Sequence, residues 1–171
     1  MMSEENKAVE KLTQNFPDQI LEVVEALGET TVSVKRDQIA AMMKFLKEDP
    51  ELKFEVLMDL FGVDYLEMGG FERFAVVYHL YSDTFNKRLR VKAFVPEGDE
   101  TIDSVTHLWA AANWPEREVF DMYGISFNNH PDLRRLLCPD NFEGFPLRKD
   151  FPLEGIGYRE SFHKVTRENA Q

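Results

Sequence analysis

Apolar positions recur at helical spacing in two segments of the first fifty residues. Ser3 can cap the first segment and Pro17 ends it, while the second covers residues 37–47 and closes at Asp49-Pro50, because the residue before a proline avoids the helical region. Two short amphipathic helices are therefore predicted. Their apolar faces are Val9, Leu12 and Phe16 in the first, and Ile39, Met42, Met43 and Leu46 in the second.

Residues 20–27 fit two different structures. Their apolar side chains can form one stripe of a helix, yet the run ILEVV, followed by Gly28 and the alternating TVSV, also fits a β-hairpin. We prefer the hairpin.

Three later runs are rich in β-branched and aromatic residues and are separated by short Gly-rich or polar turns. They cover residues 54–66, 71–82 and 88–96, and they predict an antiparallel meander. Residues 104–112 and 114–123 are then predicted to be helical. The expected fold class is α+β, a mostly antiparallel sheet with helices packed on one face.

The segment NWPEREVFDMYG has the features of a complete helix. Asn113 can cap it, Glu116 can complete a capping box, and Gly124 can end it. Helical spacing places one apolar face and one crowded charged surface on it. The apolar face consists of Val119, Met122 and Tyr123, and the charged surface of Glu116, Arg117, Glu118 and Asp121.

Those four charges allow three interpretations. They can form a solvated face in which Arg117 and Asp121 pair at i, i+4 spacing, for a few tenths of a kcal/mol. An acid–base pair of Glu116 and Glu118 is disfavoured, since residues two apart on a helix point about 200° apart. The third interpretation is that the charges bind a partner or the following segment.

Residues 124–171 contain prolines and glycines that forbid long helices or central strands, together with many large apolar side chains. Such a segment is too apolar for a solvated tail and needs a surface to lie on. We therefore divide the chain into an α+β domain, residues 1–123, and a long irregular C-terminal arm, residues 124–171. The arm is expected to dock on partner subunits, and docking on its own domain is the alternative.

Composition narrows the function. The 171 residues carry a net charge of −11, all of it in residues 1–123, which disfavours nucleic acid and anionic lipid as partners. The single cysteine, Cys138, cannot form an internal disulfide or a four-thiolate metal site. No apolar run approaches the roughly 20 residues of a bilayer-spanning helix, so direct membrane insertion is not expected.

The helix and the arm together resemble a known family. The motif is ERE, two residues, Asp121, two apolar residues, six residues, His130, three residues, Arg134, one residue, and Leu136-Leu137. It resembles, without a gap, the signature of the 30-kilodalton-type subunit, designated C, of the proton-pumping NADH:quinone oxidoreductase, respiratory complex I. DLFGVDY, VVYHL, VKAFVP and GFPLRKDFPL extend the resemblance to about residues 50–158. Phe145 departs from it, because relatives often have histidine there, so a proton role at this position is doubtful.

The resemblance implies a non-catalytic structural subunit on the cytoplasmic side of the cell membrane, peripheral, in the arm of the complex that carries electrons from NADH to quinone. It implies no flavin, quinone or iron-sulfur cluster in this chain, and partners that are the large quinone-site subunit and the iron-sulfur subunits. By position, the expected subunit interface is Glu116, Arg117, Glu118, Asp121, His130, Arg134, Arg135, Arg148, Lys149 and Asp150. Each of these can instead brace the arm against its own domain.

Two alternatives and two weaker signals remain. The same motif could belong to a sister complex, a ferredoxin:quinone oxidoreductase or a membrane-bound hydrogenase, and the other alternative is a free-standing small acidic enzyme. The four histidines, His79, His107, His130 and His163, share no metal-ligand spacing. Aromatic residues around the ERE helix are interpreted as core rather than as an electron path, namely Trp109, Trp114, Phe120 and Tyr123.

Overall fold

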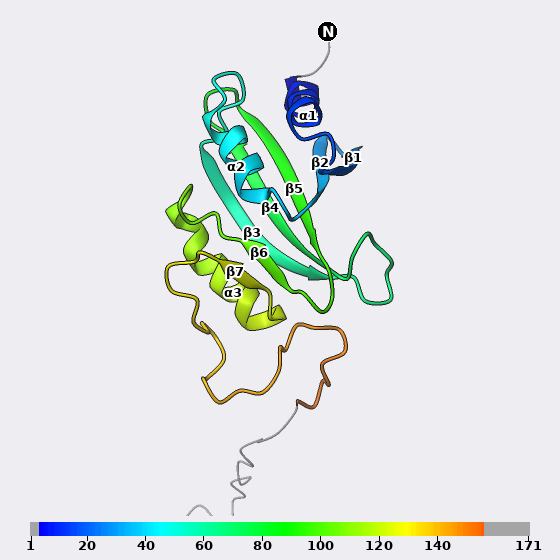
Figure 1. Ribbon diagram of the computed structural model, residues 1–171, viewed down its shortest axis with the longest axis vertical. Helices are drawn as coiled ribbons and strands as arrows, with labels where there is room; N and C mark the ends of the chain where they lie inside the picture. The colour runs from blue at the N-terminus through cyan, green and yellow to red at the C-terminus, as the bar shows by residue number, and fades with distance from the viewer. Residues whose placement is uncertain (1–3, 156–171) are drawn as a thin grey trace, which may run out of the picture.

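The computed structural model describes the backbone of residues 4–155, drawn as a ribbon in Figure 1. Within this range, helices cover a five-stranded sheet, and two short strands form a second sheet beside it. The elements in chain order are α1 (Glu4–Asn15), β1 (Ile20–Ala26), β2 (Glu29–Lys35), α2 (Ile39–Glu48), β3 (Val56–Asp64), β4 (Phe74–Ser82), β5 (Lys87–Val95), β6 (Thr101–Asp103), the 3-10 helix η1 (Ala110–Ala112), α3 (Asn113–Tyr123) and β7 (Ser126–Asn128).

The main sheet has the strand order β1-β2-β5-β4-β3 and is antiparallel except for the parallel pair β2–β5. The β1–β2 hairpin turns through Leu27 and Gly28, both at positive φ, so the prediction of a hairpin is confirmed. The antiparallel meander is confirmed as β3-β4-β5. The parallel pair arises because α2, β3 and β4 intervene before the chain returns beside β2, and parallel neighbours require such a crossover.

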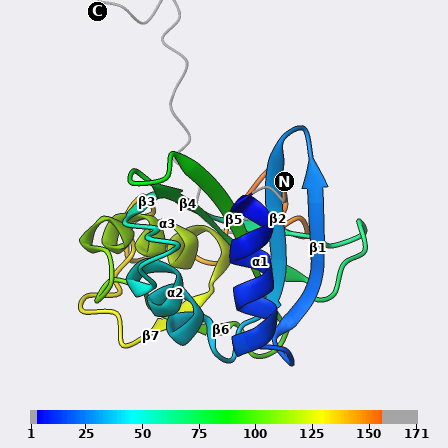
Figure 2. The same ribbon diagram turned by 90° about the horizontal axis from the view of Figure 1, so that it is seen from above.

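Alternating side chains give the main sheet one covered face and one open face. On β4, residues Phe74, Val76, Tyr78 and Leu80 point to the covered face and are at most 1% exposed. Helices α1 and α2 pack on this face and lie on the same side of the strands (Figure 2). The four predicted apolar positions of α2 are all buried. The α+β class with helices on one face is therefore confirmed, while Ser3, the predicted cap of the first helix, lies outside the described residues.

Helix α3 packs on β3 at a position where the strand has no side chain. A Cβ added to Gly62 would lie 2.6 Å from Cδ2 of Tyr123, so the glycine is what lets the ring rest on the strand. Val119 of α3 joins the same core, next to Leu60 of β3. The covered face of the sheet thus extends under α3.

The prediction of a helix over residues 104–112 is wrong. The segment consists of turns and the short η1, because side chains supply the acceptors that helical carbonyls would otherwise provide. The Val105 N–H donates to Oε1 of Glu116 over 2.8 Å, and the Thr106 N–H donates to Oγ of Ser104 over 3.1 Å. The strands β6 and β7, which pair in parallel on either side of α3 in sequence, were not predicted.

The predicted capping box of α3 is also wrong. Asn113 has helical angles, φ −52° and ψ −52°, and is the first residue of the helix, while its N-cap, Ala112, makes no side-chain bond. Glu116 turns toward Val105 instead of back to the cap. The predicted end of the helix is confirmed, since Gly124 is left-handed at φ 77° and donates to the Phe120 carbonyl over 2.9 Å.

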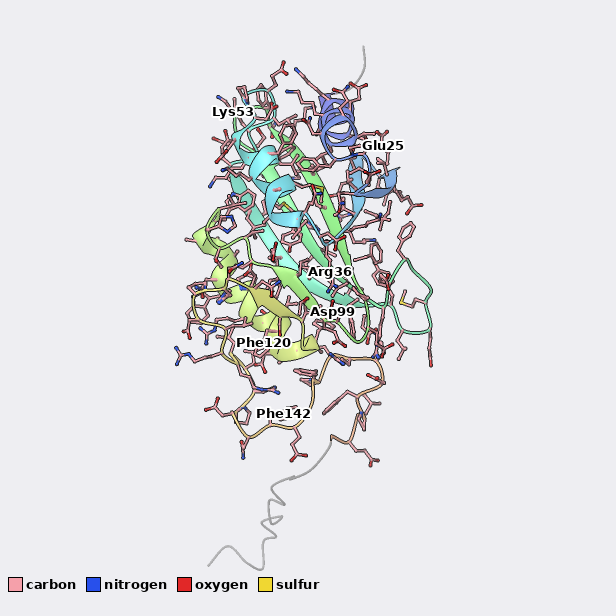
Figure 3. All side chains as sticks on the ribbon, viewed as in Figure 1. Glu25, Arg36, Lys53, Asp99, Phe120 and Phe142 are labelled. Carbon is pink, nitrogen blue, oxygen red and sulfur yellow. The ribbon has the colours of Figure 1, made fainter. Side chains whose placement is uncertain are left out.

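A partly buried arginine connects the main sheet to the small one. Arg36, directly after β2, donates to the Asp99 carboxylate and carbonyl and, over 2.7 Å, to the carbonyl of Thr101 at the start of β6 (Figure 3). From residue 129 to Gly155 the chain forms turns without a helix or strand. We call residues 129–155 the arm segment; the rest of the predicted arm lies outside the described residues.

Candidate functional site at the junction of helix α3 and the arm segment

Asp121 is the centre of the junction between α3 and the arm segment. Its carboxylate is fully buried, and Oδ2 accepts the backbone N–H groups of Leu136 at 3.0 Å, Leu137 at 2.7 Å and Cys138 at 2.9 Å. Oδ1 pairs with Nη1 of Arg135 at 2.9 Å. Burial alone would raise the pKa of Asp121, but these four donors outweigh it and hold the pKa below its usual value.

Arg135 connects Asp121 to the aromatic residues of the arm segment. Besides the ion pair, its Nη2 donates to the Gly144 carbonyl over 3.2 Å. The guanidinium also lies 5.9 Å from the ring centre of Phe142 and 5.5 Å from that of Phe145, within the range of cation–π attraction. A single arginine therefore holds two turns of the arm segment that are otherwise without regular structure.

Arg117 binds the arm segment as well. Its Nε donates to the Arg134 carbonyl over 3.0 Å and its Nη2 to the Arg135 carbonyl over 3.2 Å, so the planar guanidinium spans two successive peptides. It does not pair with Asp121, and the interpretation of a solvated face with an i, i+4 ion pair is wrong. Of the three interpretations, the contacts within the chain match binding to the following segment.

Glu116 and His130 form a second buried pair at this junction. Both side chains are 0% exposed, and His130 Nε2 lies 3.9 Å from Glu116 Oε2, which has no hydrogen-bond partner among the described residues. The Nδ1 of His130 accepts the Asp132 N–H over 3.0 Å, so in the neutral ring the proton is on Nε2, 3.2 Å from the Asn113 carbonyl. Burial raises the pKa of Glu116 to about 7.

The C-terminal end of the arm segment is fixed by a buried ion pair that sequence reasoning missed. Asp64 ends β3 on its inward-facing side, is fully buried and pairs with Nη2 of Arg73 at 3.1 Å. The same Nη2 lies 2.8 Å from Asp150 Oδ1, and the Lys149 N–H donates to Asp64 Oδ2 over 2.9 Å. Burial opposes ionisation of Asp64, but Arg73 and the N–H donors outweigh it and lower its pKa. The sequence did contain a signal for this ion pair, because Asp64 is an acidic residue at an inward-facing position of a strand.

Arg148 attaches the same stretch to the end of α3. Its Nε donates to the Tyr123 carbonyl over 2.7 Å, and its guanidinium lies 4.8 Å from the ring centre of Phe74 and 4.7 Å from that of Phe145. Phe145 in turn packs against the helix end, since a Cβ on Gly124 would lie 2.5 Å from its ring. The Phe145 side chain thus fills a packed site.

Comparison with known proteins bears on this junction directly. Residues 32–156, which include α3 and the arm segment, match the family described as the respiratory-chain NADH dehydrogenase 30 Kd subunit. The chain belongs to this family. The NADH-quinone oxidoreductase subunit designated C in Geotalea uraniireducens is 53% identical over 154 residues, covering 90% of this chain and 92% of the relative. Its counterpart in Geobacter metallireducens is 52% identical over 157 residues, covering 91% and 94%.

Two solved structures share the fold. The trypsin-resistant fragment (1-134) of Nqo5 is 35% identical with a TM-score of 0.65, over 75% of this chain and 99% of the fragment. A chain of the membrane-bound sulfane sulfur reductase, an archaeal respiratory membrane complex, superposes with a TM-score of 0.70 over 88% of this chain and 87% of its own. At 22% identity, the second likeness shows the fold alone.

The remaining predicted interface residues do not join these buried clusters. Glu118 is exposed on α3, the Lys149 side chain is exposed, and Arg134 pairs with Asp132 at 2.6 Å on the surface. Several apolar side chains of α3 and of the arm segment are exposed as well. They are Trp114 at 64%, Leu137 at 64%, Leu147 at 48% and Leu153 at 103%. Trp114 is therefore not part of the core as predicted; it lies under the Arg117 guanidinium, 5.5 Å away.

The junction holds few groups that are free for chemistry. Among the residues that the structure describes, no three His, Cys, Asp or Glu side chains gather as metal ligands, and His163 lies outside that part. Cys138 is partly buried, and burial raises the pKa of its thiol. No helix in the described part of the chain is long and apolar enough to cross a membrane. What the site can do, on this geometry, is hold a defined surface in place.

Proposed function

We propose that this chain is the 30-kilodalton-type subunit of an NADH:quinone oxidoreductase, and that it acts there as a non-catalytic structural subunit of the peripheral arm. The observation that carries the proposal is the junction itself, in a member of the 30 Kd subunit family. Its buried charges hold the arm segment on the domain, and exposed apolar side chains and exposed charges occur on α3 and on the arm segment. A surface of this composition fits protein–protein contact.

The partners in this proposal are the large quinone-site subunit and the iron-sulfur subunits, since the relatives are named as one subunit of a larger NADH-quinone oxidoreductase. The exposed members of the predicted interface, Glu118, Arg134 and Lys149, would touch them directly. The buried members, Glu116, Asp121 and His130, would act one step away, by shaping the segment that the partners meet. The complex would place the chain peripherally, on the cytoplasmic side of the membrane.

The absence of a catalytic site and of a cofactor is part of the proposal. Four donors occupy the Asp121 carboxylate, and the fully buried Glu116 lies away from solvent, so neither can meet a substrate without disassembly of the junction. Flavin and iron-sulfur clusters would reside in the partner subunits. Electron transfer would then pass beside this chain without passing through it.

The test is affinity purification of the tagged chain at native expression level from gently solubilised membranes. We expect quinone-site and iron-sulfur subunits in the eluate by mass spectrometry, together with NADH:quinone activity. Recovery of hydrogenase or ferredoxin-linked subunits would transfer the same structural role to a sister complex. Recovery of the chain alone, from membranes that contain the assembled enzyme, would overturn the proposal.

A further inference from the structure

We propose that the open face of the main sheet binds an acidic segment of a neighbouring subunit that also carries apolar side chains. The proposal depends on the proposed function for the existence of that neighbour, and it adds a second surface, away from α3 and the arm segment. The side chains that define the open face are Val56, Met58 and Phe61 of β3, His79 of β4, Arg88, Arg90 and Lys92 of β5, and Lys35 of β2.

The strands β4 and β5 of this face are basic although the chain is acidic, and the carboxylates of the face lie on the flanking strands β1, β2 and β3. The whole sequence has 31 acidic and 20 basic residues, yet β4 and β5 contain four basic residues, Lys87, Arg88, Arg90 and Lys92, and no acidic one. Three of the four share one face of β5 by the two-residue period of a strand, and Lys35 lies across from Phe94 on the same side. Because salt screens charges beyond about 8 Å, a partner at contact distance meets this local stripe rather than the net charge.

The apolar part of the face lies on the neighbouring edge strand. Val56 is 41% exposed, Met58 51% and Phe61 38%, although inward positions of the same strand are buried. Phe61 lies against the His79 ring, with 5.5 Å between their centres. An apolar patch bordered by cations fits an amphipathic protein segment better than nucleic acid, whose backbone offers phosphates and no aliphatic side chains.

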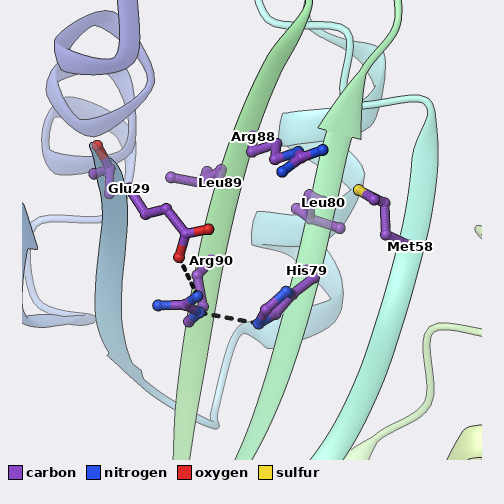
Figure 4. Close-up of a pocket in the computed structure, with 8 residues that line it drawn as sticks. Glu29, Met58, His79, Leu80, Arg88, Leu89 and Arg90 are labelled. Carbon is purple, nitrogen blue, oxygen red and sulfur yellow. Dashed lines mark hydrogen bonds and ion pairs between the residues drawn. The ribbon is translucent and has the colours of Figure 1, made fainter. Parts of the chain in front are cut away.

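A recess of about 70 Å³ lies between side chains of β2, β3, β4 and β5 (Figure 4), and two arginines, Arg88 and Arg90, line it. Arg90 pairs with Glu29 and donates from Nε to Nε2 of His79 over 2.9 Å. Burial, and then the Arg90 charge, lower the pKa of His79, so the ring stays a neutral acceptor. Arg88 also lines the recess but makes no ion pair with any residue that the structure describes.

The carboxylates on this face are Glu22, Glu29 and Asp59, and among the described residues none of them forms an ion pair with Arg88 or Lys92. Glu29 is occupied by Arg90, and Asp59 accepts the N–H of Leu60 over 2.8 Å. The ammonium of Lys92 lies 5.5 Å from the Tyr65 ring centre. Arg88, Lys92 and Lys35 are therefore basic side chains of this face that have no ion pair among the described residues, and exposed apolar groups lie on the neighbouring strand β3. A carboxylate of a partner can pair bidentately with the Arg88 guanidinium.

The first test is zero-length carbodiimide cross-linking of the purified complex, which joins a lysine amine only to a carboxylate in contact with it. We expect Lys92 or Lys35 to be joined to an acidic peptide of another subunit, and Lys44, exposed on α2 at the helix-covered side, not to be joined to that peptide. Links from Lys92 and Lys35 confined to this chain, in a preparation that contains the other subunits, would overturn the inference. So would links between labelled and unlabelled copies of the chain, since these would make the occupant a second copy.

The second test compares Arg88→Glu with the matched control Lys44→Glu in the same purification. We expect Arg88→Glu to lower the yield of co-purified subunits about tenfold, and the control to leave it unchanged. Equal thermal unfolding of the two variants shows that folding is intact. Equal yields from both would overturn the docking surface alone, whereas a wild-type chain without partners would overturn the proposed function. Loss of binding to anionic lipid vesicles in Arg88→Glu, with the yield of subunits unchanged, would also overturn the docking surface.

Discussion

Two carboxylates five residues apart on α3 have pKa values shifted in opposite directions, and the number of donors around each explains the difference. Both are fully buried, which favours the neutral form of each. Asp121 meets three backbone N–H groups and a guanidinium, so its charge is favoured despite burial. Glu116 meets fewer donors, the Ser104 side chain and the Val105 N–H, and its Oε2 has no hydrogen-bond partner among the described residues, so burial prevails.

Replacing Asp121 by alanine should release the arm segment. Removing the carboxylate leaves three N–H groups without their acceptor and the partly buried Arg135 without its ion pair, a loss of about 3 to 5 kcal/mol by analogy with buried ion pairs. Limited proteolysis of the purified chain should show faster cleavage within residues 129–155, and urea unfolding should show lower stability. Glu118→Ala, on the exposed side of the same helix, is the control. Equal cleavage of both variants would mean that Asp121 does not hold the segment.

Replacing Glu116 by glutamine should change how stability depends on pH. Since burial raises the folded pKa from 4.5 to about 7, the folded chain binds one more proton than the unfolded chain between these values. The stabilising contribution is complete below 4.5 and is lost as pH rises through 7, on the order of 3 kcal/mol in all. Glutamine keeps an acceptor for Val105 and does not ionise. Urea unfolding at pH 5 and pH 8 should therefore show a smaller loss in the variant, and parallel profiles would contradict this assignment.

At the scale of elements, local patterns predicted what local forces decide. The hairpin β1–β2, the helix α2 and the end of α3 at Gly124 follow from periodicity and turn residues within a few positions. The predicted helix over 104–112 fails because its N–H groups have acceptors elsewhere, including Glu116, eleven residues away. The role of Asp64 was not predicted for the same reason, because its partner Lys149 is 85 residues away in the sequence. Residue type and spacing identified the charged side chains of α3, but not the direction in which each one points.

The contact between α3 and β3 offers a test of packing. An alanine at Gly62 would place its Cβ within 2.6 Å of the Tyr123 ring, so strand and helix must separate, at a cost of about 1 to 3 kcal/mol. Gly62→Ala should lower the unfolding midpoint of the isolated chain, and combining it with Tyr123→Ala should cost less than the two changes added together. Strict additivity of the two free energies would show that the ring does not constrain the glycine.

At the scale of the whole molecule, the two surfaces proposed for partners are stabilised by different interactions. The open face of the sheet is held by strand pairing, which needs no part of the arm segment. The junction surface depends on charged side chains that attach turns without regular structure to α3 and to β3. Substitutions at the junction should therefore leave the sheet folded. They should weaken the partner contacts of the junction and not those of the open face.

Replacing Arg117 by alanine should separate the stability of the isolated chain from its binding to partner subunits. Its guanidinium donates only to carbonyls of the arm segment and stacks on the exposed Trp114, so its removal leaves the core of the domain untouched. The unfolding midpoint of the isolated chain should stay within experimental error. The amount of complex recovered through the tagged chain should fall, by about tenfold if two charge-assisted bonds shape the contact surface. Arg117→Lys, which keeps the charge but cannot span both carbonyls, should fall between alanine and wild type. Wild-type recovery with Arg117→Ala would restrict the arginine to a role inside this chain, whereas a lowered midpoint would show that the arm segment and the domain unfold as one unit.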